Sequence, residues 1–118
     1  MINIKPLMNK QYDEFKYSCW DYCRDVYRIN GMGDLPEFNN IDKHGHLRGA
    51  RGIQRELSRF KPCEYKEGAL ALMRVSNVPL HIGVCCGGRA IAHLDYERGP
   101  VIEFIKDLDI EGYYEPQD

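Results

Sequence analysis

The sequence lacks any apolar run that approaches the roughly 18 residues needed to span a bilayer. The segment Met1 to Pro6 also lacks the apolar core of a signal peptide, so we expect that the chain does not export itself. An excess of charge of one sign is also lacking, because 16 basic residues nearly balance 18 acidic ones and the formal net charge is -2. Neither nucleic acid nor a membrane is therefore an expected partner.

A disulfide framework and a metal-binding pattern are also missing. Five cysteines cannot all pair within one chain, and the adjacent Cys85 and Cys86 suit a disulfide poorly, so reduced thiols are expected. We therefore expect synthesis in the cytoplasm, with delivery to any outside target by another system such as lysis, secretion or a virus particle. His44-Gly45-His46 with Cys63 or with the cysteine pair lacks the ligand spacing of a zinc site, so no metal is expected.

Internal repeats and low-complexity segments are absent from the 118 residues. This length suffices for one domain with one core and is too short for two. Hydrophobic residues make up 43% of the chain and charged residues 29%, which argues against disorder and against a fibrous class. We expect a single domain over residues 1–118.

A helical pattern is present from residue 9 to residue 30, as one or two helices. Gly31 and Gly33 are stop signals at its end. The residues predicted to face the core are Tyr12 and Phe15, then Trp20, Cys23 and Tyr27.

A helix start is predicted inside this range. Ser18 is the expected N-cap, with Asp21 at the third helical position, which places Cys19 in the first turn. Backbone N–H groups and the positive end of the helix dipole lower the pKa of a cysteine there, and the thiolate is the nucleophilic form. The same N–H groups can form part of an oxyanion hole. The structural alternative is that Cys19 is a small buried apolar residue.

A loop is expected from Leu35 to His46, followed by a helix from about Leu47 to Phe60 whose apolar side is thin. The opposite side of this helix carries an arginine stripe. It is either a solvated face or a contact for substrate carboxylates or an assembly partner. The stripe consists of Arg48, Arg51, Arg55 and Arg59.

Strand patterns begin after Gly68, and turn residues separate them into an antiparallel meander. Helices followed by strands, without βαβ alternation, indicate an α+β domain with helix packed on one face of the sheet. The predicted strands are residues 69–75, 81–86, 90–96 and 101–105.

Two histidines, His81 and His93, lie on neighbouring predicted strands. A two-residue turn at Gly87-Gly88 would point them to opposite faces of the sheet. A three-residue loop of Cys86, Gly87 and Gly88 would place His81 directly opposite His93. In the second arrangement His81 is the general base for Cys19, and His93 orients it. The alternative is an ordinary hydrogen-bonded pair.

Five blocks in this order resemble the NlpC/P60 family of cysteine peptidases, particularly its short, phage-encoded tail-assembly or cell-wall-hydrolase branch. The resemblance covers roughly residues 12 to 110. The blocks are residues 18–27, which contain the Cys-Trp pair and the Val-Tyr end, 31–36, 67–74, 79–84 and 90–93.

The resemblance implies a papain-like α+β fold, with N-terminal helices packed on an antiparallel meander. It also implies hydrolysis of peptidoglycan stem peptides, commonly at the bond from D-γ-glutamate to the diamino acid, through a thioester. Cys19, His81 and His93 would be nucleophile, base and orienting residue. No cofactor is implied, and phage tail proteins are additional expected partners.

The resemblance has two departures, since the family usually has Asp where Ser18 and Ala69 stand. Tyr12 or Tyr17 would complete the oxyanion hole, and Ser18 and Trp20 flank the nucleophile as further oxyanion or substrate-binding candidates. Two alternatives stay open. One is a non-catalytic tail-tip or assembly protein that keeps the fold, and the other is a cysteine acyltransferase or deamidase that uses the same residues.

Overall fold

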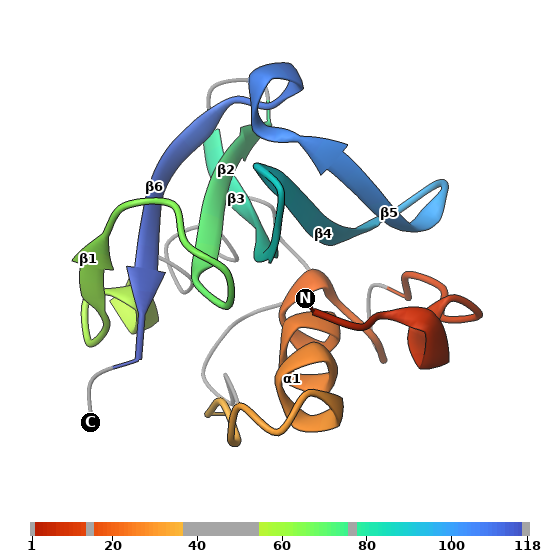
Figure 1. Ribbon diagram of the computed structural model, residues 1–118. Helices are drawn as coiled ribbons and strands as arrows, with labels where there is room; N and C mark the ends of the chain where they lie inside the picture. The colour runs from red at the N-terminus through yellow and green to blue at the C-terminus, as the bar shows by residue number, and fades with distance from the viewer. Residues whose placement is uncertain (1, 14–15, 37–54, 76–77, 117–118) are drawn as a thin grey trace.

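The computed structural model describes residues 2–13, 16–36, 55–75 and 78–116. Figure 1 shows a curved sheet above α1 (Cys19–Ile29), with β1 (Lys61–Cys63) and β6 (Ile110–Glu115) at its left and β5 (Gly99–Phe104) at its right. None of the described helices is long and apolar enough to cross a membrane. The elements are η1 (Lys5–Leu7), α1 (Cys19–Ile29), β1 (Lys61–Cys63), β2 (Leu70–Val75), β3 (Val78–Gly87), β4 (Ala90–Asp95), β5 (Gly99–Phe104), η2 (Ile105–Asp107) and β6 (Ile110–Glu115).

The six strands form one sheet in the order β1-β6-β2-β3-β4-β5, and every neighbouring pair is antiparallel. The predicted meander corresponds to β2 through β5, and each predicted strand overlaps its observed counterpart. The sequence prediction missed β1 and β6. β1 is only three residues long and contains Pro62, while β6 contains Gly112, and both residues weaken a strand pattern.

The start of α1 follows directly from its sequence. The Ser18 side chain accepts a hydrogen bond from the Asp21 amide, and the Asp21 carboxylate accepts one from the Ser18 amide at 2.8 Å. This reciprocal capping box satisfies two N–H groups that the first turn leaves unpaired. Gly31, with φ of 69°, follows the C-cap. The predicted cap, the position of Cys19 and the end of the helix are therefore confirmed.

The predicted helical segment before Ser18 is wrong for the described residues. Residues 10–12 have no regular structure, and Asp13 and Tyr17 form an isolated antiparallel bridge. The Asp13 carboxylate and carbonyl accept hydrogen bonds from the following turn, including the Lys16 amide at 3.1 Å. Such local bonds compete with a helix. Phe15 lies outside the described residues.

Most of the second predicted helix also lies outside the described residues. Residues 55–57 are helical, and Phe60 closes that segment with a hydrogen bond to Leu57. Arg59 is 73% exposed and pairs with Glu56 in its own segment, as expected of a solvated helix face. Of the arginine stripe, Arg48 and Arg51 lie outside the described residues.

The sheet has an apolar cluster on each face. On one face, the α1 residues Trp20, Cys23 and Tyr27 pack with Ile82 and other strand residues, as the helical spacing predicted. The Tyr27 hydroxyl also donates to the Gly68 carbonyl, which ties α1 to the start of β2. The cluster on the other face contains Ala69, Ala71, Met73, Cys85 and Ile91.

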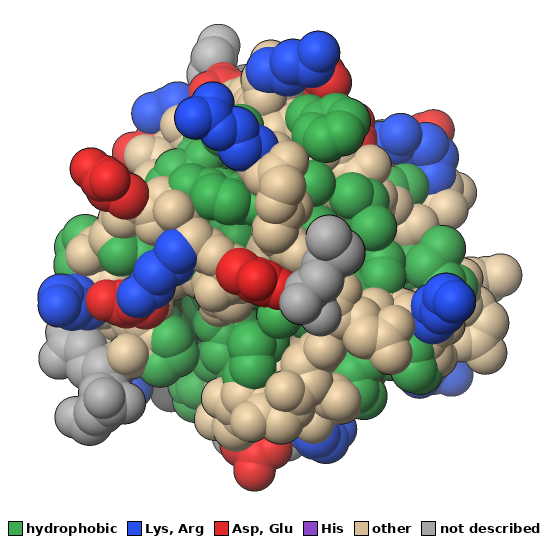
Figure 2. All heavy atoms as spheres, viewed as in Figure 1, with side chains coloured by type: hydrophobic (Ala, Val, Ile, Leu, Met, Phe, Trp, Pro, Cys, Tyr) green, Lys and Arg blue, Asp and Glu red, His purple; other side chains and the backbone are tan. Residues whose placement is uncertain are grey.

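Charged side chains on the face seen in Figure 2 are of both signs and are interspersed among hydrophobic and neutral groups. This mixture agrees with the small net charge of the sequence.

Candidate active site

The Cys19 thiol lies where the N-terminus of α1 meets β3. Its side chain is almost buried, with 8% of the residue exposed. The sulfur accepts hydrogen bonds from the backbone N–H groups of Ile82 and Trp20. Because Ile82 directly follows His81 in β3, the thiol lies against the backbone next to that histidine. Within the described part of the chain, no hydrogen bond links the thiol to His81.

The pKa of Cys19 departs from the expectation for a first-turn cysteine. Burial raises this pKa from 9.0 to about 11, although the amide hydrogen bonds from Ile82 and Trp20 act to lower it. The expected lowering is therefore wrong for the substrate-free protein. The physical reason is that loss of hydration disfavours the thiolate more than the helix N-terminus favours it. At neutral pH the resting sulfur is a thiol.

The two histidines share a face of the sheet, but neither predicted turn is correct. Gly88 and Arg89 form the turn with φ of 63° and 60°, the backbone of a type I′ turn, and the register shifts between Cys85 and Gly87. His93 therefore pairs with Gly83. The predicted partner of His93 was His81, which lies two residues before Gly83. Because side chains in a strand alternate between the two faces with period two, both histidines still lie on the same face of the sheet. His81 and His93 are diagonal neighbours, and the predicted direct opposition is wrong.

The diagonal arrangement still brings the two imidazoles together. His81 Nε2 lies 2.9 Å from His93 Nδ1, and the ring centroids are 4.9 Å apart in an edge-to-face orientation. Burial, and to a smaller extent the neighbouring His93, lowers the pKa of His81 from 6.5 to about 4. Burial also lowers the pKa of His93. Both rings are therefore neutral near pH 7, so each has one N–H and one free lone pair.

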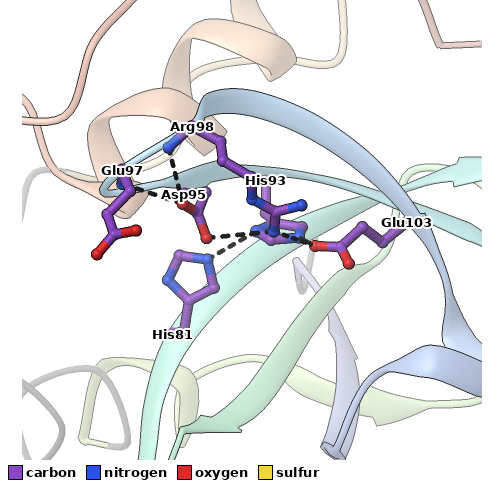
Figure 3. Close-up of polar contacts among 6 residues, drawn as sticks. All are labelled: His81, His93, Asp95, Glu97, Arg98 and Glu103. Atoms are coloured by element: carbon purple, nitrogen blue, oxygen red, sulfur yellow. Dashed lines mark hydrogen bonds and ion pairs between the residues drawn. The ribbon is translucent and has the colours of Figure 1, made fainter.

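A carboxylate that the sequence analysis did not identify continues this chain of contacts. Figure 3 shows Glu103 of β5 beside His93, with Arg98 between the two carboxylates of Asp95 and Glu103. Glu103 Oε1 lies 2.9 Å from His93 Nε2 and accepts a second hydrogen bond from Arg98 at 2.9 Å. The available signal was a carboxylate inside the predicted strand 101–105, but using it required the β4–β5 register, in which Ile91 pairs with Glu103.

The two tyrosines expected at the oxyanion hole have other contacts. The Tyr17 hydroxyl donates to Asp25 at 2.6 Å, a bond that must break before the hydroxyl can stabilise an oxyanion. Tyr12 is 37% exposed, and its ring lies edge-on to that of Tyr96, with centroids 6.2 Å apart. Their role at the site stays a prediction.

The residues that flank the nucleophile hold the backbone in place. Ser18 caps α1 and its hydroxyl also contacts the Asp21 carboxylate at 2.9 Å. Trp20 packs edge-on against Phe60, and its indole N–H donates to the Pro36 carbonyl at 2.8 Å. Both side chains are thus occupied by structural contacts in the substrate-free protein. Their proposed substrate-binding role is untested.

Among the described residues, no group of three or more histidine, cysteine, aspartate or glutamate side chains has a metal-binding arrangement. His44 and His46, the histidines of the weak zinc candidate, lie outside the described residues.

Comparison with known proteins gives one informative result. No family model matches the sequence, and no curated protein matches it. Solved structures do match, and one is the crystal structure of the NlpC/p60 domain of the peptidoglycan hydrolase SagA. The TM-score is 0.60 with 13% sequence identity, and the match covers 96% of this chain and 91% of that chain. The fold is NlpC/P60-like.

The NlpC/P60-like fold agrees with the α+β class expected from helix followed by strands. The comparison does not confirm the plural N-terminal helices, and residues 10–12 and 16–18 are not helical. It also gives no support to the phage-encoded branch in particular. At 13% identity the likeness concerns the fold, so the chemistry has to be argued from the residues of this chain.

Proposed function

We propose that this protein is a cysteine peptidase that hydrolyses peptidoglycan stem peptides. The observation that carries the proposal is the position of the Cys19 thiol, at a helix N-terminus and against the backbone next to the His81–His93 pair. A helix-terminal cysteine beside a neutral imidazole base is suited to acyl transfer. The peptidoglycan substrate is suggested by the fold, which is shared with a domain of a peptidoglycan hydrolase.

The proposed reaction has two stages. His81 takes the Cys19 proton as the sulfur attacks the peptide carbonyl, and the first-turn N–H groups stabilise the developing oxyanion. The imidazolium then gives this proton to the leaving amine, which breaks the peptide bond and leaves a thioester. In the second stage His81 removes a proton from water, the hydroxyl attacks the thioester, and a carboxylic acid and the free thiol are released.

The raised pKa of Cys19 determines how the first stage begins. A resting thiolate–imidazolium pair would need a thiol pKa below that of the imidazole, and burial here shifts the two pKa values apart. The proton therefore moves as the sulfur attacks. Hydrogen bonds between a catalytic base and the group that gives it a proton are often long in the free enzyme and shorten when substrate binds.

The burial of the same thiol favours a second candidate, a protein that keeps the fold without the chemistry. A sulfur that is 8% exposed and protonated reacts slowly with any electrophile. In this case the chain would be an assembly component, and association with a phage tail is the form that the sequence resemblance suggests. We also propose that the protein acts either in a virion or at a cell wall after delivery by another system.

Mass spectrometry of purified muropeptides that contain diaminopimelate tests both candidates. The wild-type protein should release the product cut on the carbonyl side of the γ-linked glutamate, and Cys19→Ala should not. Cys63→Ala is the matched control, because Cys63 is a free cysteine in β1 outside the site. No cleavage by folded wild-type protein would refute the peptidase and favour the non-catalytic candidate. A new amide product would instead indicate acyl transfer to an amine.

A further inference from the structure

A carboxylate lies beside the histidine pair. Glu103 extends from β5, the strand next to the one that carries His93. Its Oε1 atom lies 2.9 Å from His93 Nε2, and His93 Nδ1 in turn lies 2.9 Å from His81 Nε2. The three side chains therefore form one continuous line of hydrogen bonds that ends on the proposed base.

Arg98 keeps the Glu103 carboxylate, at the far end of this line, ionised. Its Nη2 atom donates to the same Oε1 atom of Glu103 at 2.9 Å. Burial acts to raise the pKa of Glu103, but the hydrogen bonds from Arg98 and His93 outweigh it, and the pKa falls below its usual value. A carboxylate that has lost its proton can only accept hydrogen bonds. Glu103 therefore acts as an acceptor at both contacts.

Arg98 itself is held by the turn between β4 and β5. One oxygen of Asp95 accepts the backbone N–H groups of Glu97 at 3.0 Å and Arg98 at 2.8 Å, and the other accepts the Arg98 guanidinium at 3.3 Å. Aspartate commonly organises turns in this way. The turn therefore directs the guanidinium toward Glu103.

The direction of the whole line follows from this single acceptor. Because Glu103 can only accept, His93 must carry its proton on Nε2, and a neutral imidazole then has a bare Nδ1. That bare nitrogen must accept from His81, so His81 carries its proton on Nε2. The remaining nitrogen of His81, Nδ1, is left with a free lone pair. Within the described part of the chain, Nδ1 of His81 has no hydrogen-bond partner.

We propose that Glu103, clamped by Arg98, is a positioning residue that fixes the tautomers of both histidines and leaves His81 Nδ1 as the nitrogen that accepts the Cys19 proton. The tautomer part of this inference stands on the hydrogen bonds together with the neutral state of the two buried imidazoles. The consequence for proton transfer rests on the proposed function. Without the carboxylate, the histidine pair can reverse its hydrogen bond, and reversal puts the proton on the nitrogen that the reaction needs bare.

The test is nitrogen NMR of the histidine side chains in the full 118-residue chain, uniformly labelled with 15N, at pH 7. The wild type should show both histidines protonated on Nε2. Glu103→Ala should show a mixture of tautomers for both rings. Glu103→Gln should retain the wild-type pattern, because Arg98 still directs an acceptor oxygen toward His93. Glu97→Ala is the matched control, since that exposed carboxylate lies on the same turn and contacts neither ring.

Kinetics supply the second readout. Glu103→Ala should lower kcat for muropeptide cleavage by roughly tenfold, part of the 10²–10⁴ that general acid–base catalysis contributes. Glu103→Gln should recover most of the loss, while KM stays unchanged in both. Protonation of His81 on Nδ1 in the wild type, or unaltered tautomers in Glu103→Ala, would overturn the inference. The spectra need no substrate, so they test the tautomers independently of cleavage. If the wild type did not cleave muropeptides, the proposed function would be refuted, but tautomers that depend on Glu103 would still support the positioning role.

Discussion

Replacing Gly83 with alanine should destabilise the protein by more than its small size suggests. Gly83 is buried in β3 directly opposite His93. A Cβ atom there would lie 2.7 Å from Ile91 Cγ2, 2.8 Å from the Ala92 carbonyl oxygen and 2.9 Å from His93 Cβ. The carbonyl and the histidine Cβ are fixed to the backbone of β4. They cannot rotate away, so β3 and β4 must move apart.

The size of the effect follows from the number of these contacts. Overpacking a well-packed core costs about 1–3 kcal/mol, and contact with fixed backbone atoms places Gly83→Ala near the upper end, about 3 kcal/mol. Gly112→Ala is the matched control in β6, because its nearest neighbours are side-chain atoms of Tyr114 at 3.4 Å or more. Because alanine loses less backbone entropy than glycine on folding, the free energy of unfolding of Gly112→Ala should stay within about 1 kcal/mol of the wild type.

Urea unfolding at pH 7 measures both variants against the wild type. The midpoint for Gly83→Ala should fall while the slope with denaturant stays the same, since the surface exposed on unfolding is unchanged. The shift of β4 should also lengthen the contact between His93 and His81. Equal free energies of unfolding for the two alanine variants would refute the argument that the strands leave no room for a side chain beside His93.

Three further predictions concern buried groups. Because the pKa of His81 is about 4 rather than 6.5, unfolded chains bind a proton between these pH values that the folded protein does not. The free energy of unfolding should be at its full value above pH 6.5 and should fall by up to about 3 kcal/mol as the pH drops through 4. His81→Gln should show a flatter dependence of stability on pH, and a dependence equal to that of the wild type would count against the argument. The buried Tyr22 hydroxyl has no hydrogen-bond partner among the described residues, so Tyr22→Phe should match or exceed wild-type stability by up to about 1 kcal/mol in thermal unfolding, and a loss would show that the hydroxyl is bonded. Cys19, with its pKa raised to about 11, should be alkylated more slowly than Cys63 at pH 7, as peptide mapping would show, and rapid labelling of Cys19 below pH 7 would indicate a resting thiolate.

Features set by neighbouring residues in the chain were predictable from the sequence. The start of α1 depends on Ser18 and Asp21, which are three residues apart, and the end depends on Gly31. Strands β2 to β5 alternate and are separated by turn residues, so their existence and order were predictable too. In each case the signal and the structure lie within one short segment.

Features that depend on distant contacts or on an unusual backbone conformation were not predictable. The turn between β3 and β4 requires positive φ at Arg89, a residue that rarely adopts it, so the register was misjudged. The contribution of Glu103 required the register of β5 against β4. The pKa of Cys19 depends on burial by β3, which the helix pattern alone does not reveal. The sequence therefore predicted which residues are candidates and that the two histidines share a face of the sheet. It did not predict the strand register or the burial of Cys19.

The position of β6 has a consequence for the order in which the protein can assemble. β6 lies between β1 and β2, although it follows all the other strands in the chain. During synthesis the β2–β5 meander can form early, but β1 pairs with β6 alone among the described strands and must wait until β6 leaves the ribosome. Until that moment the edge of β2 is open to other chains. The segment that completes the sheet is therefore also the one that ends the period in which the nascent protein is prone to aggregate.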